Sequence, residues 1–155
     1  MALYSRIPIA DSRILNFSEA GIPSVYAVLD TPSGPLHFIG THPVPPVSGR
    51  NTRLRNDQLG RAAEFARALS GAILLAGDLN VTSDSPVFGD LREASGLRDS
   101  RRGFGVQATW PAPSPVRIPI DHALHSDGVH IRDRRVGPPV GSDHLPVILD
   151  ITISP

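Results

Sequence analysis

The sequence has no cysteine and no lysine, and each absence excludes a class of chemistry. Without cysteine the chain can form no disulfide, no thiolate metal site and no thiol nucleophile. Without lysine it can form no Schiff base, because all 15 cationic side chains are arginines. Any chemistry must therefore rest on aspartate, histidine, asparagine or serine side chains, or on a metal that they bind.

Long apolar runs and an excess of one charge are also absent. No segment approaches the ~18 apolar residues of a membrane helix. The start, MALYSRIPIADSR, lacks the basic and apolar regions of a signal peptide, so a cytoplasmic location is expected by default. The 15 acidic residues balance the 15 basic ones. This balance argues against a generic basic clamp for nucleic acid, which stays open as a substrate but is not favoured.

The chain has 155 residues and is 40% hydrophobic, which suits one domain with its own core. Apolar alternation and apolar runs predict strands over 24–30, 36–41, 72–76, 118–125, 129–136 and 146–153. Helical spacing predicts a long helix over 52–69, capped by Asn51 or Thr52 and stopped by Gly71, and a shorter one over 86–95. Strands interrupted by helices predict an α+β or α/β layered domain.

Polar side chains that suit catalysis lie where the predicted strands end or begin. They are His42, Asp78, Asn80, Asp121, Asp143 and His144. A buried aspartate costs several kcal/mol unless it is paired or bound to a metal, so an aspartate in the apolar strand IPIDHAL needs a partner. Hard divalent cations prefer carboxylate and carbonyl oxygens, which Asp78, Asn80 and Asp143 can supply. His144 is the natural general base or transition-state partner, with a carboxylate behind it.

This set of motifs resembles the endonuclease/exonuclease/phosphatase superfamily, the metal-dependent phosphoesterases related to deoxyribonuclease I. The match runs in order through ALYSRIPI, GTHP, RNDQL, GDLN, ATW, PIDHAL and GSDHLPV. GDLN and SDH in this order, with ID between them, are specific, whereas each alone is a weak signal. The resemblance implies a sandwich of two sheets with outer helices.

The resemblance also implies a role for each site residue. Asp78 and Asn80 would bind the metal and orient the nucleophile, and Asp143 would serve the metal site. Asp121 would pair with His144, itself a further candidate ligand. The remaining matches are His42, which would contact the scissile phosphate, and Thr109 with Trp110 in a loop near the site.

One departure from the family pattern concerns its N-terminal part. The family domain begins with strands that end in an asparagine and a metal-binding glutamate, and both precede the position that matches ALYSRIPI. The three glutamates present, Glu19, Glu64 and Glu93, lie in a predicted turn and two predicted helices. We therefore expect a single truncated domain over 1–155.

Two expectations follow from the missing strands. An exposed apolar sheet face would recruit a partner, and we predict a homodimer that rebuilds the sandwich. The metal site must be incomplete or rebuilt from the residues present. Mg²⁺ or Mn²⁺ is favoured, and a site richer in histidine would move the preference toward Mn²⁺, Zn²⁺ or a similar ion.

The predicted function is a divalent-metal-dependent phosphoesterase, with phosphodiesters favoured and metal-activated water as the nucleophile. The alternative is a catalytically incomplete fragment or a partner-dependent module of such an enzyme. A serine esterase is disfavoured, because the sequence has no G-x-S-x-G elbow.

The arginine clusters and the other histidines are not predicted to belong to this site. The group of Arg50, Arg53 and Arg55 is interpreted as a solvated loop and helix face, with phosphate binding as the alternative. The group of Arg132, Arg134 and Arg135 is interpreted as charge on an edge strand. His122 and His125, three apart on a strand, are expected to face opposite sides and to be structural.

Overall fold

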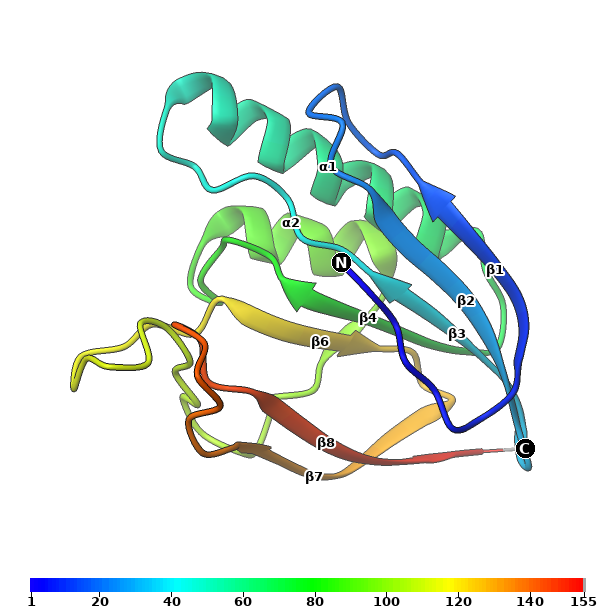
Figure 1. Ribbon diagram of the computed structural model, residues 1–155. Coiled ribbons are helices and arrows are strands. Elements are labelled where there is room, and N and C mark those ends of the chain that lie inside the picture. The colour runs from blue at the N-terminus through cyan, green and yellow to red at the C-terminus, as the bar shows by residue number, and fades with distance from the viewer. Residues whose placement is uncertain (155) are drawn as a thin grey trace.

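The computed structural model describes residues 1–154 and shows two β-sheets and two helices in that range (Figure 1). The larger sheet has the strand order β1-β2-β3-β4-β6-β5, and the smaller one pairs β7 with β8. The strands are β1 Ile9–Leu15, β2 Ser24–Thr31, β3 Gly34–Gly40, β4 Ala72–Asp78, β5 Arg98–Asp99, β6 Asp121–His125, β7 Val129–Val136 and β8 Val147–Ile153. The helices are α1 Gly49–Arg67 and α2 Pro86–Ser95.

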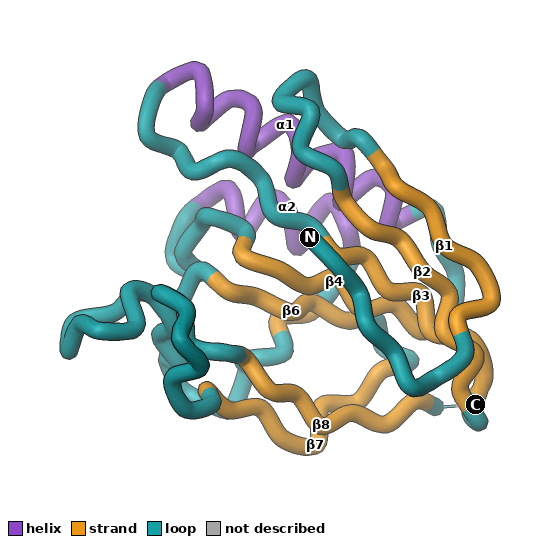
Figure 2. The backbone as a smooth tube through the Cα atoms, in the orientation of Figure 1, coloured by secondary structure: helices purple, strands orange, loops and turns teal. Residues whose placement is uncertain are grey.

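The elements form layers, with both helices on one face of the larger sheet and the smaller sheet on the other (Figure 1, Figure 2). One apolar cluster lies between the helices and the larger sheet and includes Ile39, Leu59 and Leu75. A second, smaller cluster that includes Leu36 and Val129 lies between the two sheets. The α+β sandwich predicted from the sequence is confirmed.

The apolar run AILLA forms the middle of the larger sheet, as its continuous hydrophobicity predicts. β4 pairs parallel with β3 and antiparallel with β6, so both of its edges are occupied. Ile73 and Leu75 belong to the cluster under the helices, whereas Ala72 and Leu74 pack in the cluster between the sheets. Both faces of this strand are therefore covered, and it fixes where the chain emerges at Asp78.

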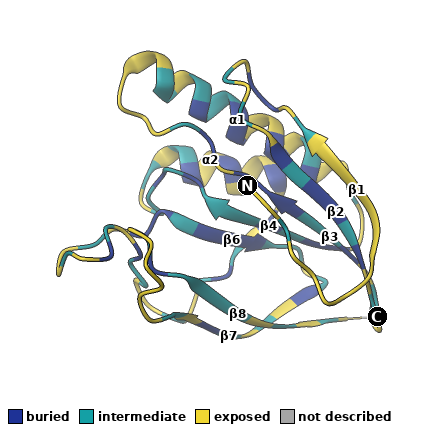
Figure 3. Ribbon diagram, in the orientation of Figure 1, coloured by how far each residue is buried: buried dark blue, intermediate teal, exposed yellow. Residues whose placement is uncertain are grey.

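The strand predictions were correct in the interior of the sheet and wrong at its edges. β1 was not predicted, because nearly every residue of this edge strand is exposed and its pattern IADSRIL carries no apolar face (Figure 3). The two-residue β5 was not predicted either. β6 begins at Asp121 rather than at residue 118, since Ile118 forms only an isolated bridge with Trp110.

The long helix begins one turn earlier than predicted. Ser48 is its N-cap and accepts a hydrogen bond from the backbone N–H of Asn51, so neither predicted cap residue is the cap. The helix ends at Arg67 with Ala68 as C-cap, and Gly71 lies in the turn that follows. The shorter helix has the predicted bounds.

The two sheets differ in how far they are covered. In the larger sheet β2 and β6 are mostly buried, whereas the apolar side chains of β8 remain half-exposed (Figure 3). Within residues 1–154 no helix has the length and apolarity that crossing a membrane requires.

His122 is buried against Phe88 under the helices, with ring centroids 4.4 Å apart. Its Nε2 donates to the carbonyl of Val81 at 2.8 Å, and its buried Nδ1 has no hydrogen-bond partner among the described residues. Burial lowers the pKa of His122, because a proton on Nδ1 would meet no acceptor.

We predict that this histidine makes the fold acid-sensitive. A histidine whose pKa is lowered on folding stabilises the native state above its unfolded pKa of about 6.5, and this contribution is lost as the pH falls below that value. His122→Gln, which keeps a donor for Val81, should therefore lose less unfolding free energy than the wild type between pH 7 and pH 5 in urea titrations. The surface substitution His130→Gln is the control, and equal losses in wild type and His122→Gln would contradict the prediction.

Candidate active site

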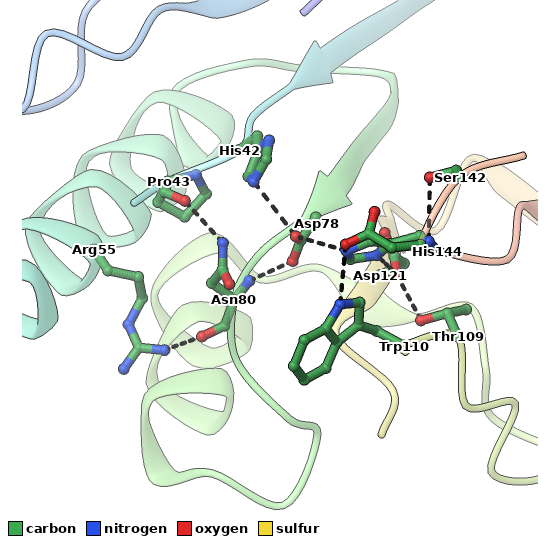
Figure 4. Close-up of polar contacts among 11 residues, drawn as sticks. His42, Pro43, Arg55, Asp78, Asn80, Thr109, Trp110, Asp121, Ser142 and His144 are labelled. Atoms are coloured by element: carbon green, nitrogen blue, oxygen red, sulfur yellow. Dashed lines mark hydrogen bonds and ion pairs between the residues drawn. The ribbon is translucent and has the colours of Figure 1, made fainter. Parts of the chain in front are cut away.

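The ends of three strands meet at one edge of the larger sheet. β3 and β4 are parallel neighbours, so their carboxyl ends place His42 and Asp78 side by side. β6 runs antiparallel to β4, and its first residue, Asp121, is the register partner of Asp78. His144 comes from the loop before β8, and the four side chains point toward one another (Figure 4).

Glycine is required in the GDLN motif because two backbones approach closely there. Gly77 has φ 153°, and a Cβ at this position would lie 1.9 Å from the carbonyl oxygen of Thr41. The neighbouring backbone is fixed by the hydrogen bond from Thr41 N–H to the Ala76 carbonyl, at 3.1 Å. This close contact holds the chain before His42 against the chain before Asp78.

Asp78 lies at the centre of the site. Its Oδ1 accepts a hydrogen bond from the backbone N–H of Asn80 at 2.9 Å. Its Oδ2 lies 3.4 Å from Nε2 of His42 and 3.7 Å from Nε2 of His144. The Asp78 side chain is only 13% exposed, whereas that of His42 is 53% exposed. The Asp78 carboxylate is thus largely covered, with an imidazole close to its Oδ2 on two sides.

Asp121 orients His144. Its Oδ2 accepts from Nδ1 of His144 at 2.8 Å and from the hydroxyl of Thr109 at 2.5 Å. Because a carboxylate can only accept, Nδ1 carries the proton, and Nε2 is the nitrogen that faces Asp78. Thr109 therefore belongs to the site, whereas the ATW motif predicted only a loop near it.

The electrostatics of the cluster are coupled. Burial raises the pKa of Asp78, and the charge of Asp121 raises it further. The hydrogen bond from the backbone N–H of Asn80 and the two imidazoles lower it, but they do not outweigh burial. Partial burial alone would lower the pKa of His144, but the hydrogen bond to Asp121 and the nearby carboxylates outweigh it and raise the pKa. The site thus pairs a carboxylate and an imidazole that both hold a proton more tightly than the free groups do.

Asn80 is held by both its side chain and its backbone. Its backbone is left-handed, with φ 49°, and its Nδ2 donates to the Pro43 carbonyl at 3.0 Å. The guanidinium of Arg55 donates to the Asn80 carbonyl (Figure 4). Arg55 is only 7% exposed, so placing it on a solvated face with its neighbours was wrong. The helical spacing could have revealed this, since Arg55 lies one turn before buried Leu59.

Asp143 lies on the outer side of the cluster. Its Oδ2 accepts from the indole N–H of Trp110 at 3.4 Å, and its backbone carbonyl accepts from Ala112 N–H at 2.7 Å. The rings of Trp110 and His144 lie 6.3 Å apart. A hollow of about 370 Å³ between β4, β6 and β8 opens at Asp78 and His144.

The remaining polar residues singled out in the sequence are not members of this cluster, although Arg134 donates to the main-chain carbonyl of Asp121. His122 and His125 bond separate backbone carbonyls, those of Val81 and Ser126. Arg134 is 2% exposed, so its assignment to a charged strand edge was wrong, although Arg132 and Arg135 are exposed.

The sequence profile of the Endonuclease/Exonuclease/phosphatase family matches residues 1–144. The chain belongs to this family. No curated protein matches the sequence.

Among solved structures, the family member from Beutenbergia cavernae is 21% identical, with a TM-score of 0.75 over 97% of this chain. Humanized D. rerio TDP2 is 16% identical, with a TM-score of 0.78 over 95% of the chain. The human Nocturnin catalytic domain is 16% identical, with a TM-score of 0.74 over 96% of it. At these identities the likeness establishes the shared fold.

The chain spans only part of these relatives. It covers 46% of the Beutenbergia protein, 68% of TDP2 and 61% of the Nocturnin domain. The activity of a complete family domain is therefore only a proposal for this chain.

The family is generally dependent on divalent metals, and the residues present can be compared with that requirement. Among residues 1–154 no three His, Cys, Asp or Glu side chains are grouped to hold a metal on their own. The oxygens of Asp78 and Asp143 are nevertheless those that Mg²⁺ prefers. Because Nδ2 of Asn80 bonds Pro43, its Oδ1 is the atom left for a ligand. Mg²⁺ is often held by only one or two carboxylates, with water and substrate phosphate as its other ligands, so the donor chemistry fits.

We predict that Gly77→Ala will disrupt the site through the backbone. A methyl group 1.9 Å from the Thr41 carbonyl must push β3 and β4 apart, and the positive φ adds strain. The expected loss of stability is about 2–4 kcal/mol in urea titrations, among the larger effects of single substitutions. Gly60→Ala is the matched control, because nothing lies within 4 Å of its Cβ position on α1, and it should stabilise by about 0.5–1 kcal/mol. A Gly77→Ala protein as stable as the wild type would contradict the prediction.

Proposed function

We propose that this chain uses a bound divalent metal to hydrolyse phosphate esters. Phosphodiesters are the favoured substrates. The observation that carries the proposal is the convergence of Asp78, Asp121 and His144 at the ends of β4, β6 and the loop before β8. Membership of a hydrolase family supports the class of reaction.

Asp78 is the proposed base for the attacking water. Its Oδ2 lies between Nε2 of His42 and Nε2 of His144, where it can accept the proton of a water held beside the two proposed phosphate donors. His144 is the proposed donor to a non-bridging phosphate oxygen. The hydrogen bond from its Nδ1 to Asp121 fixes the ring and favours the protonated form that can donate from Nε2.

His42 is the second proposed donor, since its half-exposed Nε2 lies on the opposite side of Asp78 from the loop of His144. Asp78, Asn80 and Asp143 are the proposed ligands of the metal. His144 is assigned the donor role instead, because its Nδ1 bonds Asp121 and its Nε2 cannot both donate a proton and bind a metal. When bound, a divalent cation would neutralise charge on the phosphoryl oxygens. Substrate contacts are then supplied by imidazoles and the metal rather than by a basic surface, which agrees with the balanced charge of the chain.

A second candidate function is a partner-dependent module without activity of its own. It is favoured by the lack of a three-ligand metal group among the described residues and by the partial span of the family domain. The two candidates differ in whether the isolated chain turns over substrate.

The deciding measurement is hydrolysis of bis(p-nitrophenyl) phosphate by the purified chain with Mg²⁺, Mn²⁺ or Zn²⁺, against EDTA. We expect metal-dependent turnover and a fall in kcat of about 100-fold or more in Asp78→Asn, because the base is lost. Asp90→Asn, an exposed aspartate on α2, is the matched control and should keep full activity. No turnover with any metal from a folded chain would reject the enzyme proposal and favour the partner-dependent module.

We also propose that two copies associate through the smaller sheet. β8 pairs only with β7 among the described strands, so its other edge is free. Val147 and Leu149 remain half-exposed where they line the hollow between the two sheets, next to Ile151 in the cluster between the sheets. Burying such side chains against a second copy removes apolar area from water. Light scattering should therefore give the mass of a dimer at micromolar concentration, with dissociation on dilution. A monomer at that concentration would contradict this prediction.

A further inference from the structure

Arg134 of β7 is a buried cation that forms no ion pair with a carboxylate among residues 1–154, although Asp99 and Asp121 are close enough to affect its pKa. It is among the largest side chains that are fully buried, at 2% exposure. Its Nε donates to Ser100 Oγ at 3.1 Å, its Nη2 to the Asp121 carbonyl at 3.3 Å, and its Nη1 to Oε1 of Gln107. No ion pair within 4.0 Å reaches it from residues 1–154. Burying an unpaired charge is unfavourable, so a stability role alone explains this arginine poorly.

A β-bulge turns Arg134 inward. In the register of β7 with β8, Ile131 lies opposite Ile151 and Asp133 lies opposite Asp150, so Arg132 has no partner. Without this extra residue, strict alternation from buried Val129 would place Arg134 on the outer face. Bulges commonly re-aim side chains beside active sites, and this one points a guanidinium at the start of β6.

Arg134 also holds the loop that carries Thr109. Nε2 of Gln107 donates back to the Arg134 carbonyl and, at 3.1 Å, to the Phe104 carbonyl. Gln107 has a left-handed backbone, with φ 48°, which an L-residue adopts only where its surroundings impose it. Two residues later, Thr109 donates to the Asp121 carboxylate. Arg134 is thus bonded to the backbone of Asp121 and, through Gln107, to the loop of Thr109.

We propose that Arg134 is a positioning residue that aligns the Asp121 carboxylate with His144. The guanidinium fork fixes the Asp121 main chain and the Gln107 loop relative to each other, so that Oδ2 of Asp121 can accept from Thr109 and His144 together. The expected effect of Arg134 on turnover rests on the proposed function, whereas its expected effect on the hydrogen bond between Asp121 and His144 does not.

The test compares Arg134→Met and Arg134→Lys with the wild type by two readouts. The first is the proton resonance of His144 Nδ1–H in the metal-free protein, assigned through its loss in His144→Gln. We expect it to be displaced or lost in Arg134→Met, because Asp121 is no longer aligned. The second is phosphodiester turnover, where kcat should fall on the order of 10- to 100-fold with KM within about twofold. The kcat of Arg134→Lys should lie between those of the wild type and Arg134→Met, since an ammonium cannot reach all three acceptors at once.

Arg135→Met is the matched control, because this adjacent arginine is exposed and its guanidinium bonds the exposed side of β7 at Asp133 rather than the site. It should leave both readouts unchanged. If Arg134→Met does not fold, Gln107→Leu replaces it, since it removes the loop side of the same link and should displace the His144 resonance as well.

The two readouts separate the proposals. A displaced His144 resonance in a chain without turnover would support the positioning role and reject the enzyme. An unchanged resonance and unchanged kcat in a folded Arg134→Met protein would overturn the positioning role and leave the enzyme proposal standing.

Discussion

The pairing of Asp78 with Asp121 across β4 and β6 is the constraint on which the rest of the site depends. The sheet register places two carboxylates opposite each other at the edge where β4 ends and β6 begins. Like charges this close repel, and the charge of Asp121 contributes to the raised pKa of Asp78. His144 touches both carboxylates and His42 approaches the first, so the imidazoles offset the repulsion. A protein that only needed to fold would gain from an apolar pair at this position.

Two buried arginines bond the main chain at or next to this pair. Arg55 on α1 donates to the Asn80 carbonyl, and Arg134 on β7 donates to the Asp121 carbonyl. Each thus fixes the main chain of a site residue rather than pairing with its side chain. Burial lowers the pKa of both guanidinium groups, yet arginine remains charged because its ordinary value is so high. Lysine, absent from this sequence, would be neutralised more readily at such sites.

The sequence predicted the middle of the fold well because burial leaves a periodic pattern. β4 extends its predicted bounds by two residues, since a continuous apolar run indicates a strand covered on both faces, and α2 has its predicted bounds, since its apolar residues repeat with helical spacing. Edge strand β1 was missed, because its stability comes from pairing with β2 and it buries almost nothing. The motif positions placed His42, Asp78, Asp121 and His144 at strand ends, and the structure shows the four side chains together there, while their roles stay predictions.

What the sequence could not show depends on single-residue shifts and long-range contacts. The bulge at Arg132 changes the face of every later residue in β7, and no local sequence pattern predicts this bulge. Arg134 therefore resembled a surface charge although it is among the most buried side chains. The same shift explains why the smaller sheet does more than cover the larger one. Its first part, with Val129 and Ile131, packs on the apolar cluster between the sheets, and its second part inserts a cation beside the site. One extra residue thus joins the packing of the sandwich to the alignment of Asp121.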